Sequence, residues 1–276
     1  MRIPVLSAPR KGFTAVVLVV ASIVLTFGAA QAITFGTPDG TRHPNVGALL
    51  ADYDPDSPGP DILCSGTLIA ERVFLTAAHC TAFLASEGIQ QVWVTFAPTY
   101  DEDSTSLAGL FAGTYVTHPQ FGSGGQSDPH DIAVVLLQQS PGLRPARLPT
   151  AGLLDELKAG HQLDEQAFTA VGYGTAREDK RTGPHAFFFD GIRRYALQSA
   201  LNLEKSWLLL SMQPSTGNGG GCYGDSGGPH FLGGAASDLI VSTTITGDAM
   251  CRATDKTYRL DTAAARAFLG DFVALP

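Results

Sequence analysis

The chain has 276 residues, of which 44% are hydrophobic and 16% charged, a balance typical of a folded globular protein rather than a disordered one. The formal net charge is −8, and this acidic excess argues against binding to nucleic acid or to an anionic membrane surface. The length allows one large domain or two of ordinary size.

Residues 1–32 have the features of a secretory signal peptide. Arg2, Arg10 and Lys11 form a basic start, residues 12–30 are almost wholly apolar, and residues 30–32 (AQA) fit a cleavage site. A retained membrane anchor is the alternative, because the apolar run approaches the length that spans a bilayer. Cleavage after residue 32 is favoured, and it leaves 15 basic and 26 acidic residues, a net charge of −11. The predicted location is therefore outside the cell.

Short apolar stretches with alternating or β-branched residues recur along the remaining chain, separated by clusters of Gly, Pro and Asp. This pattern is typical of an antiparallel all-β protein. The predicted strands are 65–69, 73–76, 91–96, 132–137, 167–172, 207–212 and 239–245.

Helices are sparse in the predicted structure. Asp261 is the expected N-cap of a helix over residues 262–269, and residues 153–160 fit either a second short helix or a turn. The proline-containing connection at residues 141–149 predicts a boundary between an N-terminal domain, 33–148, and a C-terminal domain, 149–276.

All four cysteines follow the apolar segment: Cys64, Cys80, Cys222 and Cys251. An even number of cysteines in an exported chain predicts two disulfides, and four cysteines allow three pairings. A metal site is disfavoured, because the chain has no C-x-x-C pair and no clustered histidine spacing.

Three short segments carry residues suited to nucleophilic catalysis. His79 lies in residues 76–80 (TAAHC), Asp131 begins the run DIA, and Ser226 lies in residues 222–229 (CYGDSGGP). A serine hydroxyl becomes a useful nucleophile when an imidazole takes its proton, and a buried carboxylate holds that imidazole in one tautomer. Each residue alone is a weak signal, but together they predict Ser226 as nucleophile, His79 as base and Asp131 as the orienting carboxylate.

The glycines around Ser226 predict an oxyanion hole. They allow close approach of the backbone, so the N–H groups of Gly224 and Ser226 could converge on a developing negative charge. Asp128 is an alternative to Asp131, but it lies in a Ser-Asp-Pro turn, whereas Asp131 directly precedes an apolar run. The histidines interpreted as surface or structural residues are His118, His130, His161, His185 and His230.

Residues 75–80 (LTAAHC), 131–137 (DIAVVLL) and 224–229 (GDSGGP) resemble the chymotrypsin/trypsin family of serine endopeptidases. The resemblance implies an all-β fold of two antiparallel six-stranded β-barrels with a C-terminal α-helix. The N-terminal barrel, 33–148, would supply His79 and Asp131, and the C-terminal barrel, 149–276, would supply Ser226. The family's pattern also implies disulfides between Cys64 and Cys80 and between Cys222 and Cys251.

The function implied by this resemblance is that of a secreted serine endopeptidase working through an acyl-enzyme on protein or peptide substrates. It requires no cofactor, and we expect a monomer without nucleic-acid binding or stable membrane association after signal removal. A catalytically poor relative acting as a binding protein and an acyl-ester hydrolase with the same triad are the alternatives. The acidic stretches 52–61 and 101–103 could bind calcium, but solvated loops are the more common explanation.

The resemblance also suggests an activation pair and a specificity pocket. A new amine at Ile33, created by cleavage after residue 32, would pair with Asp225. Gly220 occupies the position where trypsin-like specificity requires aspartate, and Lys256 is expected at the rear wall of the pocket. This arrangement predicts poor cleavage after basic residues and favours apolar residues over acidic ones.

Overall fold

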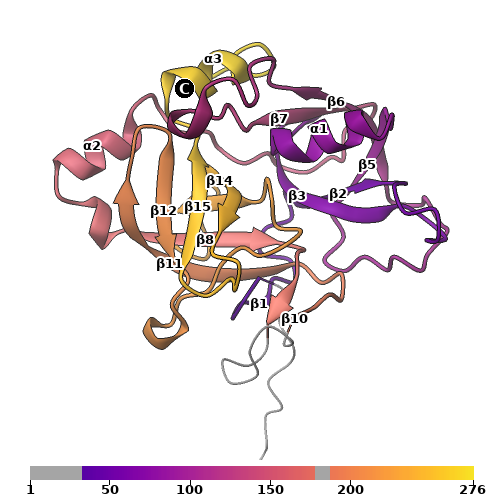
Figure 1. The fold of residues 1–276 in the computed structure, drawn as a ribbon, viewed down its shortest axis with the longest axis horizontal. Coiled ribbons are helices and arrows are strands. Elements are labelled where there is room, and N and C mark those ends of the chain that lie inside the picture. Colours follow the sequence, from indigo (N-terminus) through magenta and orange to yellow (C-terminus); the bar gives the residue numbers. More distant parts are fainter. Residues whose placement is uncertain (1–32, 178–186) are drawn as a thin grey trace, which may run out of the picture.

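The computed structural model describes residues 33–177 and 187–276, so the predicted signal peptide and His185 lie outside the described residues. Strands dominate the fold, and they form two sheets that lie side by side with the helices around them (Figure 1). In the described part of the chain, no helix is long and apolar enough to cross a membrane.

The first sheet is a closed barrel of six antiparallel strands in the order β2-β3-β4-β7-β6-β5. Its interior holds a continuous apolar core that includes Leu49, Phe74, Val94 and Val135, all fully buried. A helix, α1 (Ala78–Ser86), begins just after the end of β4. The strands are β2 (Val46–Ala51), β3 (Asp61–Ala70), β4 (Val73–Thr76), β5 (Gln91–Thr95), β6 (Phe111–Thr117) and β7 (Ala133–Leu137).

The second sheet has the order β1-β11-β12-β15-β14-β13-β8, and an additional pairing between β8 and β11 closes six of these strands into a second antiparallel barrel. A short hairpin of β9 (Ala176–Arg177) and β10 (Phe187–Phe188) lies beside it. The strands of the second sheet are β1 (Thr37–Pro38), β8 (Ala167–Gly172), β11 (Arg194–Leu203), β12 (Trp207–Ser211), β13 (Pro229–Leu232), β14 (Ile240–Gly247) and β15 (Thr254–Arg259).

The described chain begins on the second barrel. β1 pairs with β11, and the backbone of Thr34 exchanges hydrogen bonds with Gly220. The expected first domain, 33–148, thus starts with residues that the structure places on the second barrel, before the chain crosses to β2.

The C-terminal helix, α3 (Ala263–Leu269), is present, but its N-cap differs from the prediction. The hydroxyl of Thr262, rather than Asp261, accepts a hydrogen bond from the N–H of Ala265 at 3.3 Å. Asp261 instead accepts from the N–H of Leu154 in the helix α2 (Leu153–Ala159) and from Arg259. Its contact with Leu154, 107 residues away in the sequence, could not be assigned from local spacing.

Buried polar contacts hold the two barrels together. Arg193, which precedes β11, donates through Nη1 to the carbonyls of Val46 and Phe96 in the first barrel, at 2.9 and 3.0 Å. Its Nε donates to Asp39 at 2.9 Å. Trp207 on β12 donates across the same seam to the carbonyl of Gln126 at 2.8 Å.

Candidate active site

The strand pairing of the first barrel brings His79 and Asp131 together. β4 leads into α1, which carries His79, and β4 pairs with β7, which begins two residues after Asp131. Asp131 accepts hydrogen bonds from the His79 backbone N–H and from its Nδ1, each at 2.9 Å. Asp131 is only 4% exposed. Since Nδ1–H is engaged by the carboxylate, Nε2 is left as the proton acceptor.

The turn that carries Ser226 belongs to the second barrel but packs on the first. The carbonyl of Ser226 accepts from the N–H of Ser65 on β3 at 2.9 Å. Gly227 has φ of +79°, and a Cβ there would lie 2.4 Å from Oγ1 of Thr76 at the end of β4. Only glycine allows this approach, which sets the serine turn beside the segment leading to His79.

Gly224 and Ser226 offer the backbone donors expected of an oxyanion hole. Gly224 has φ of +90°, and its carbonyl accepts a hydrogen bond from the Ser65 hydroxyl at 3.1 Å. Within residues 33–177 and 187–276, neither the N–H of Gly224 nor that of Ser226 has a hydrogen-bond acceptor. Free N–H groups at this turn are suited to binding a developing oxyanion.

Asp128 contacts residues other than His79. It accepts a hydrogen bond from the hydroxyl of Tyr258 at 2.8 Å and lies 3.4 Å from Nδ1 of His130. His130 in turn stacks on His118, with ring centroids 4.7 Å apart. Burial, together with the neighbouring His130, lowers the pKa of His118. The geometry thus distinguishes the two aspartates, because only Asp131 contacts the His79 ring.

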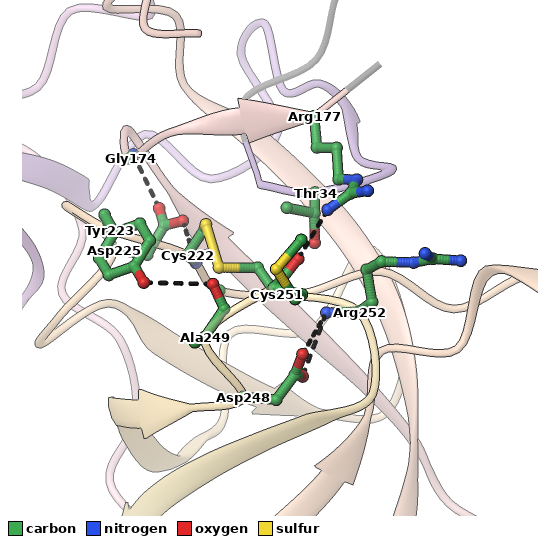
Figure 2. Close-up of a disulfide and its surroundings, with 12 residues drawn as sticks. Thr34, Gly174, Arg177, Cys222, Tyr223, Asp225, Asp248, Ala249, Cys251 and Arg252 are labelled. Carbon is green, nitrogen blue, oxygen red and sulfur yellow. Dashed lines mark hydrogen bonds between the residues drawn. A yellow bond between two sulfur atoms is a disulfide. The ribbon is translucent and has the colours of Figure 1, made fainter. Parts of the chain in front are cut away.

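The four cysteines form two disulfides, Cys64–Cys80 and Cys222–Cys251. The first joins β3 to α1, one residue after His79. Its two sulfur atoms and a ring nitrogen of His79 lie within 4.8 Å of one another, but disulfide sulfurs are not the thiolates that bind metals. The second disulfide joins the serine turn to the loop after β14 (Figure 2).

A cavity of ≈ 330 Å³ lies beside Ser226. The Cys222–Cys251 disulfide and residues of the loop 248–251 line one side, where the hydroxyl of Tyr223 donates to the carbonyl of Ala249 (Figure 2). The second barrel contributes Gly221, Thr244, Gly247 and Asp255 to the lining.

The two residues predicted to form the specificity pocket do not line this cavity. Gly220 pairs with the backbone of Thr34, and Lys256 lies with Nζ 4.1 Å from the ring centroid of Trp207. The cavity is lined instead by their neighbours in the sequence: Gly221, which follows Gly220, and Asp255, which precedes Lys256. The prediction is corrected because successive side chains of β15 point to opposite faces.

Sequence reasoning also missed a buried polar network behind the cavity. Asp255 Oδ2 accepts hydrogen bonds from the N–H of Gly221 at 2.8 Å and from Nε2 of Gln198 at 3.1 Å. His230 is fully buried, with Nδ1 2.7 Å from Gln198 Oε1 and Nε2 2.8 Å from the Thr244 hydroxyl. Burial lowers the pKa of His230, which keeps this ring neutral.

Asp225 and Ile33, the predicted activation pair, are both buried. The Asp225 carboxylate accepts from the N–H groups of Gly174 and Cys222, each at 2.8 Å (Figure 2). Burial raises the pKa of Asp225 to about 7. Ile33 packs with Ala170 of β8 and with a second alanine on β11.

Comparisons with known proteins agree with this architecture. Residues 53–258 match the model of the trypsin family. A CLIP domain-containing serine protease, B15 of Anopheles gambiae, is 28% identical over 190 residues, which are 60% of this chain and 49% of the relative. The chain therefore spans about half the length of this curated relative. A solved structure of HL collagenase is 17% identical, with a TM-score of 0.59, covering 86% of this chain and 96% of that chain, and it shows the likeness of fold.

Proposed function

Because the chain belongs to the trypsin family of serine proteases, we propose that it is a secreted serine endopeptidase that hydrolyses peptide bonds through Ser226, His79 and Asp131. The observation that carries the proposal is the pair of hydrogen bonds from His79 to the buried Asp131, beside the tightly packed serine turn. This arrangement orients Nε2 of the imidazole as a proton acceptor.

In the proposed reaction, the Ser226 hydroxyl attacks the scissile carbonyl while His79 Nε2 takes its proton. The N–H groups of Gly224 and Ser226 stabilise the oxyanion of the tetrahedral intermediate. His79 then gives the proton to the leaving amine, and an acyl-enzyme remains on Ser226. A water molecule, deprotonated by His79, releases the acid product. Asp131 holds the ring in the required tautomer and stabilises the imidazolium throughout.

The proposed substrate is a protein or peptide outside the cell, and the proposed active form is a monomer freed from its signal peptide. Two disulfides support an oxidising, extracellular setting. The acidic composition supports the proposal that the protein binds neither nucleic acid nor a membrane surface. No step of the proposed reaction calls for a cofactor.

We also propose that cleavage after residue 32 activates the enzyme. Ile33 has φ of +50°, a conformation that is unfavourable for a β-branched residue. The new N-terminal residue would have no preceding carbonyl group to clash with, so cleavage would relieve this strain. The freed amine would then be available to the buried carboxylate of Asp225, which in the intact chain is held by backbone N–H groups.

A Ser226→Ala variant tests the catalytic proposal. Its kcat on peptide substrates should fall by about 10⁴-fold or more, and a serine-directed phosphonate should label the unmodified protein but not this variant. Ser140→Ala, an exposed loop change, is the matched control and should leave both readouts intact. Near-normal turnover by a folded Ser226→Ala protein would contradict the mechanism. Absence of labelling and turnover in the unmodified protein would favour the binding-protein alternative, and ester turnover without peptide turnover would favour the ester hydrolase.

A further inference from the structure

A fully buried histidine lies behind the serine turn, and the proposed reaction does not use it. His230, on β13, is 0% exposed and is not among the residues that line the cavity. A polar side chain in the interior is costly unless hydrogen bonds satisfy it. Each ring nitrogen of His230 has such a partner, Gln198 at Nδ1 and Thr244 at Nε2. These partners indicate what the ring is placed to do.

The direction of each hydrogen bond in this network follows from Asp255. A carboxylate oxygen only accepts, so the contact of 3.1 Å between Gln198 Nε2 and Asp255 Oδ2 places the amide nitrogen on that side. The amide oxygen of Gln198 therefore accepts from Nδ1–H of His230 at 2.7 Å. With its proton on Nδ1, the neutral ring accepts at Nε2 from the Thr244 hydroxyl, 2.8 Å away. Burial lowers the pKa of His230, although Asp255 nearby opposes this, and so favours the neutral ring.

The two ends of the network contact the chain on both sides of the serine. At one end, Asp255 Oδ2 also accepts from the N–H of Gly221 at 2.8 Å, before the serine turn. At the other end, the carbonyl of Thr244 accepts from the N–H of Gly227 at 2.7 Å, and its N–H donates to the carbonyl of Gly228 at 2.9 Å. The network thus holds the backbone before the turn and directly after the nucleophile.

Thr244 makes these contacts where the pairing of strands is interrupted. The pairing of β14 with β13 ends at Thr243, and its pairing with β15 shifts register between Thr244 and Thr246. At this point the backbone of Thr244 bonds to the serine turn instead of to β13. The hydroxyl bond to His230 therefore adds a side-chain anchor where the ladder is irregular.

The neighbouring threonine has a buried hydroxyl in a different setting. Thr243 is 0% exposed, and its hydroxyl has no hydrogen-bond partner among the residues that the structure describes. Successive side chains of a strand point to opposite faces, so Thr244, and not Thr243, is directed at His230. Thr243 is thus a matched control for loss of a buried hydroxyl on this strand.

We propose that His230 is a positioning residue for catalysis, whose neutral ring, protonated at Nδ1, holds the serine turn in its reactive geometry. It acts through Thr244 after the nucleophile and through Gln198 and Asp255 before it. The inference rests on the proposed function, because the turn needs this geometry only if Ser226 attacks the substrate. Oxyanion donors lower the barrier when they are held in place before the reaction, so loss of the network should reduce kcat rather than substrate binding.

The first test removes the hydrogen bonds in the secreted, full-length protein. His230→Leu removes both ring contacts at a position out of reach of the substrate. Thr244→Val removes one hydroxyl and keeps its backbone, Thr244→Ser keeps the hydroxyl, and Thr243→Val is the matched control. We measure kcat and KM on one peptide substrate, with active sites counted by phosphonate labelling run to completion.

In His230→Leu and Thr244→Val, kcat should fall about 10- to 100-fold with KM nearly unchanged, because the nucleophile and the oxyanion donors are displaced. Thr243→Val should keep the kcat of the unmodified protein, and Thr244→Ser should recover most of the kcat that Thr244→Val loses. A variant that only loses stability would keep its kcat for each active site that is counted.

Nuclear magnetic resonance gives a readout that does not depend on turnover. In the nitrogen-labelled protein, the ring of His230 should carry its proton on Nδ1 and none on Nε2. Solvent exchange of the Gly227 N–H should be about 10-fold or more faster in His230→Leu than in Thr243→Val, because the turn opens more easily.

A proton on Nε2 of the neutral His230 ring would overturn the inference. Equal kcat in His230→Leu and Thr243→Val, or a change in KM alone, would also overturn it. If His230→Leu does not fold, Thr244→Val decides by the same measurements. Absence of phosphonate labelling in the unmodified protein would contradict the proposed function itself, whereas labelling with no loss of kcat in the variants refutes only the inference.

Discussion

Three buried carboxylates around the site differ in what donates to them. Asp131 receives both its hydrogen bonds from His79, so it controls the orientation of a side chain. Asp225 receives two backbone N–H groups and is fully buried. Asp255 is held from behind and lines the cavity. The same functional group therefore supports different proposed roles because of its surroundings: Asp131 orients the base, and Asp225 takes part in activation.

The raised pKa of Asp225 predicts how the stability of the uncut chain depends on pH. The folded-state pKa of about 7 exceeds the ordinary aspartate value of 3.8, so between these values the folded state binds more protons than the unfolded state. The free energy of unfolding should then fall as pH rises from about 4 to about 7, by up to about 1.4 kcal/mol per pH unit.

Chemical denaturation of the refolded full-length chain across this pH range measures the effect, with uncut Asp225→Asn as the control that lacks it. The secreted protein should begin at Ile33 by N-terminal sequencing and should not show the same fall, because its free amine pairs with the ionised carboxylate. Full activity from a different N-terminus would contradict the activation proposal.

At the level of secondary structure, the strongest apolar patterns were sufficient to locate strands. They were not sufficient to establish the register of the strands that line the pocket. The predicted strands 73–76 and 167–172 coincide with β4 and β8. The pairing of β14 with β15 contains an irregularity between Thr244 and Thr246. Neighbouring residues of β15 point to opposite faces, so a count along this strand that was off by one residue selected Lys256 instead of Asp255.

The sequence also indicated the triad residues more readily than the network behind the cavity. His79, Asp131 and Ser226 each lie in a recognisable local motif. Gln198 and His230 come from different strands, β11 and β13, and their contact depends on closure of the second barrel. Such a contact leaves no local pattern. Helix α1 was also missed, because its mixed apolar residues show no helical periodicity.

The disulfide between Cys64 and Cys80 should stabilise the elements that carry His79. On the chain-entropy model, a disulfide stabilises the protein by closing a loop in the unfolded chain, and the Cys64–Cys80 loop is a short one. Replacing both cysteines by alanine should therefore lower the free energy of unfolding by about 3 kcal/mol. The Cys222–Cys251 disulfide closes a longer loop, so the matched Cys222→Ala, Cys251→Ala protein should lose about 4 kcal/mol. Urea denaturation under non-reducing conditions measures both, and unchanged midpoints would show that neither bridge constrains the unfolded chain.

The whole molecule depends on polar contacts across the seam between the barrels. Arg193 is 1% exposed and bonds to two carbonyls of the first barrel and to Asp39, which follows β1. Its partner Asp39 also contacts His43. Burial alone would raise the pKa of Asp39, but the hydrogen bond from His43 outweighs it and lowers that pKa. The carboxylate is thus ionised inside the protein and relies on its partners.

Replacing Arg193 by methionine should destabilise the protein by about 3–5 kcal/mol, because Asp39 would remain buried with one partner fewer. Arg144→Met is the control, since Arg144 is 80% exposed in its ion pair with Asp238 and should change stability by less than about 1 kcal/mol. Thermal unfolding of both variants measures the difference. Equal effects would show that the seam does not depend on this arginine.

The position of Trp207 gives the molecule its own optical reporter. The chain has two tryptophans, and the indole of Trp207 bonds to Gln126 across the seam while the ammonium of Lys256 lies over its ring. Separation of the barrels would replace the contact with Gln126 by water and shift the fluorescence emission to longer wavelength. In a Trp93→Phe background, which removes the tryptophan of β5, the emission would follow the docking of the barrels in real time without an added label.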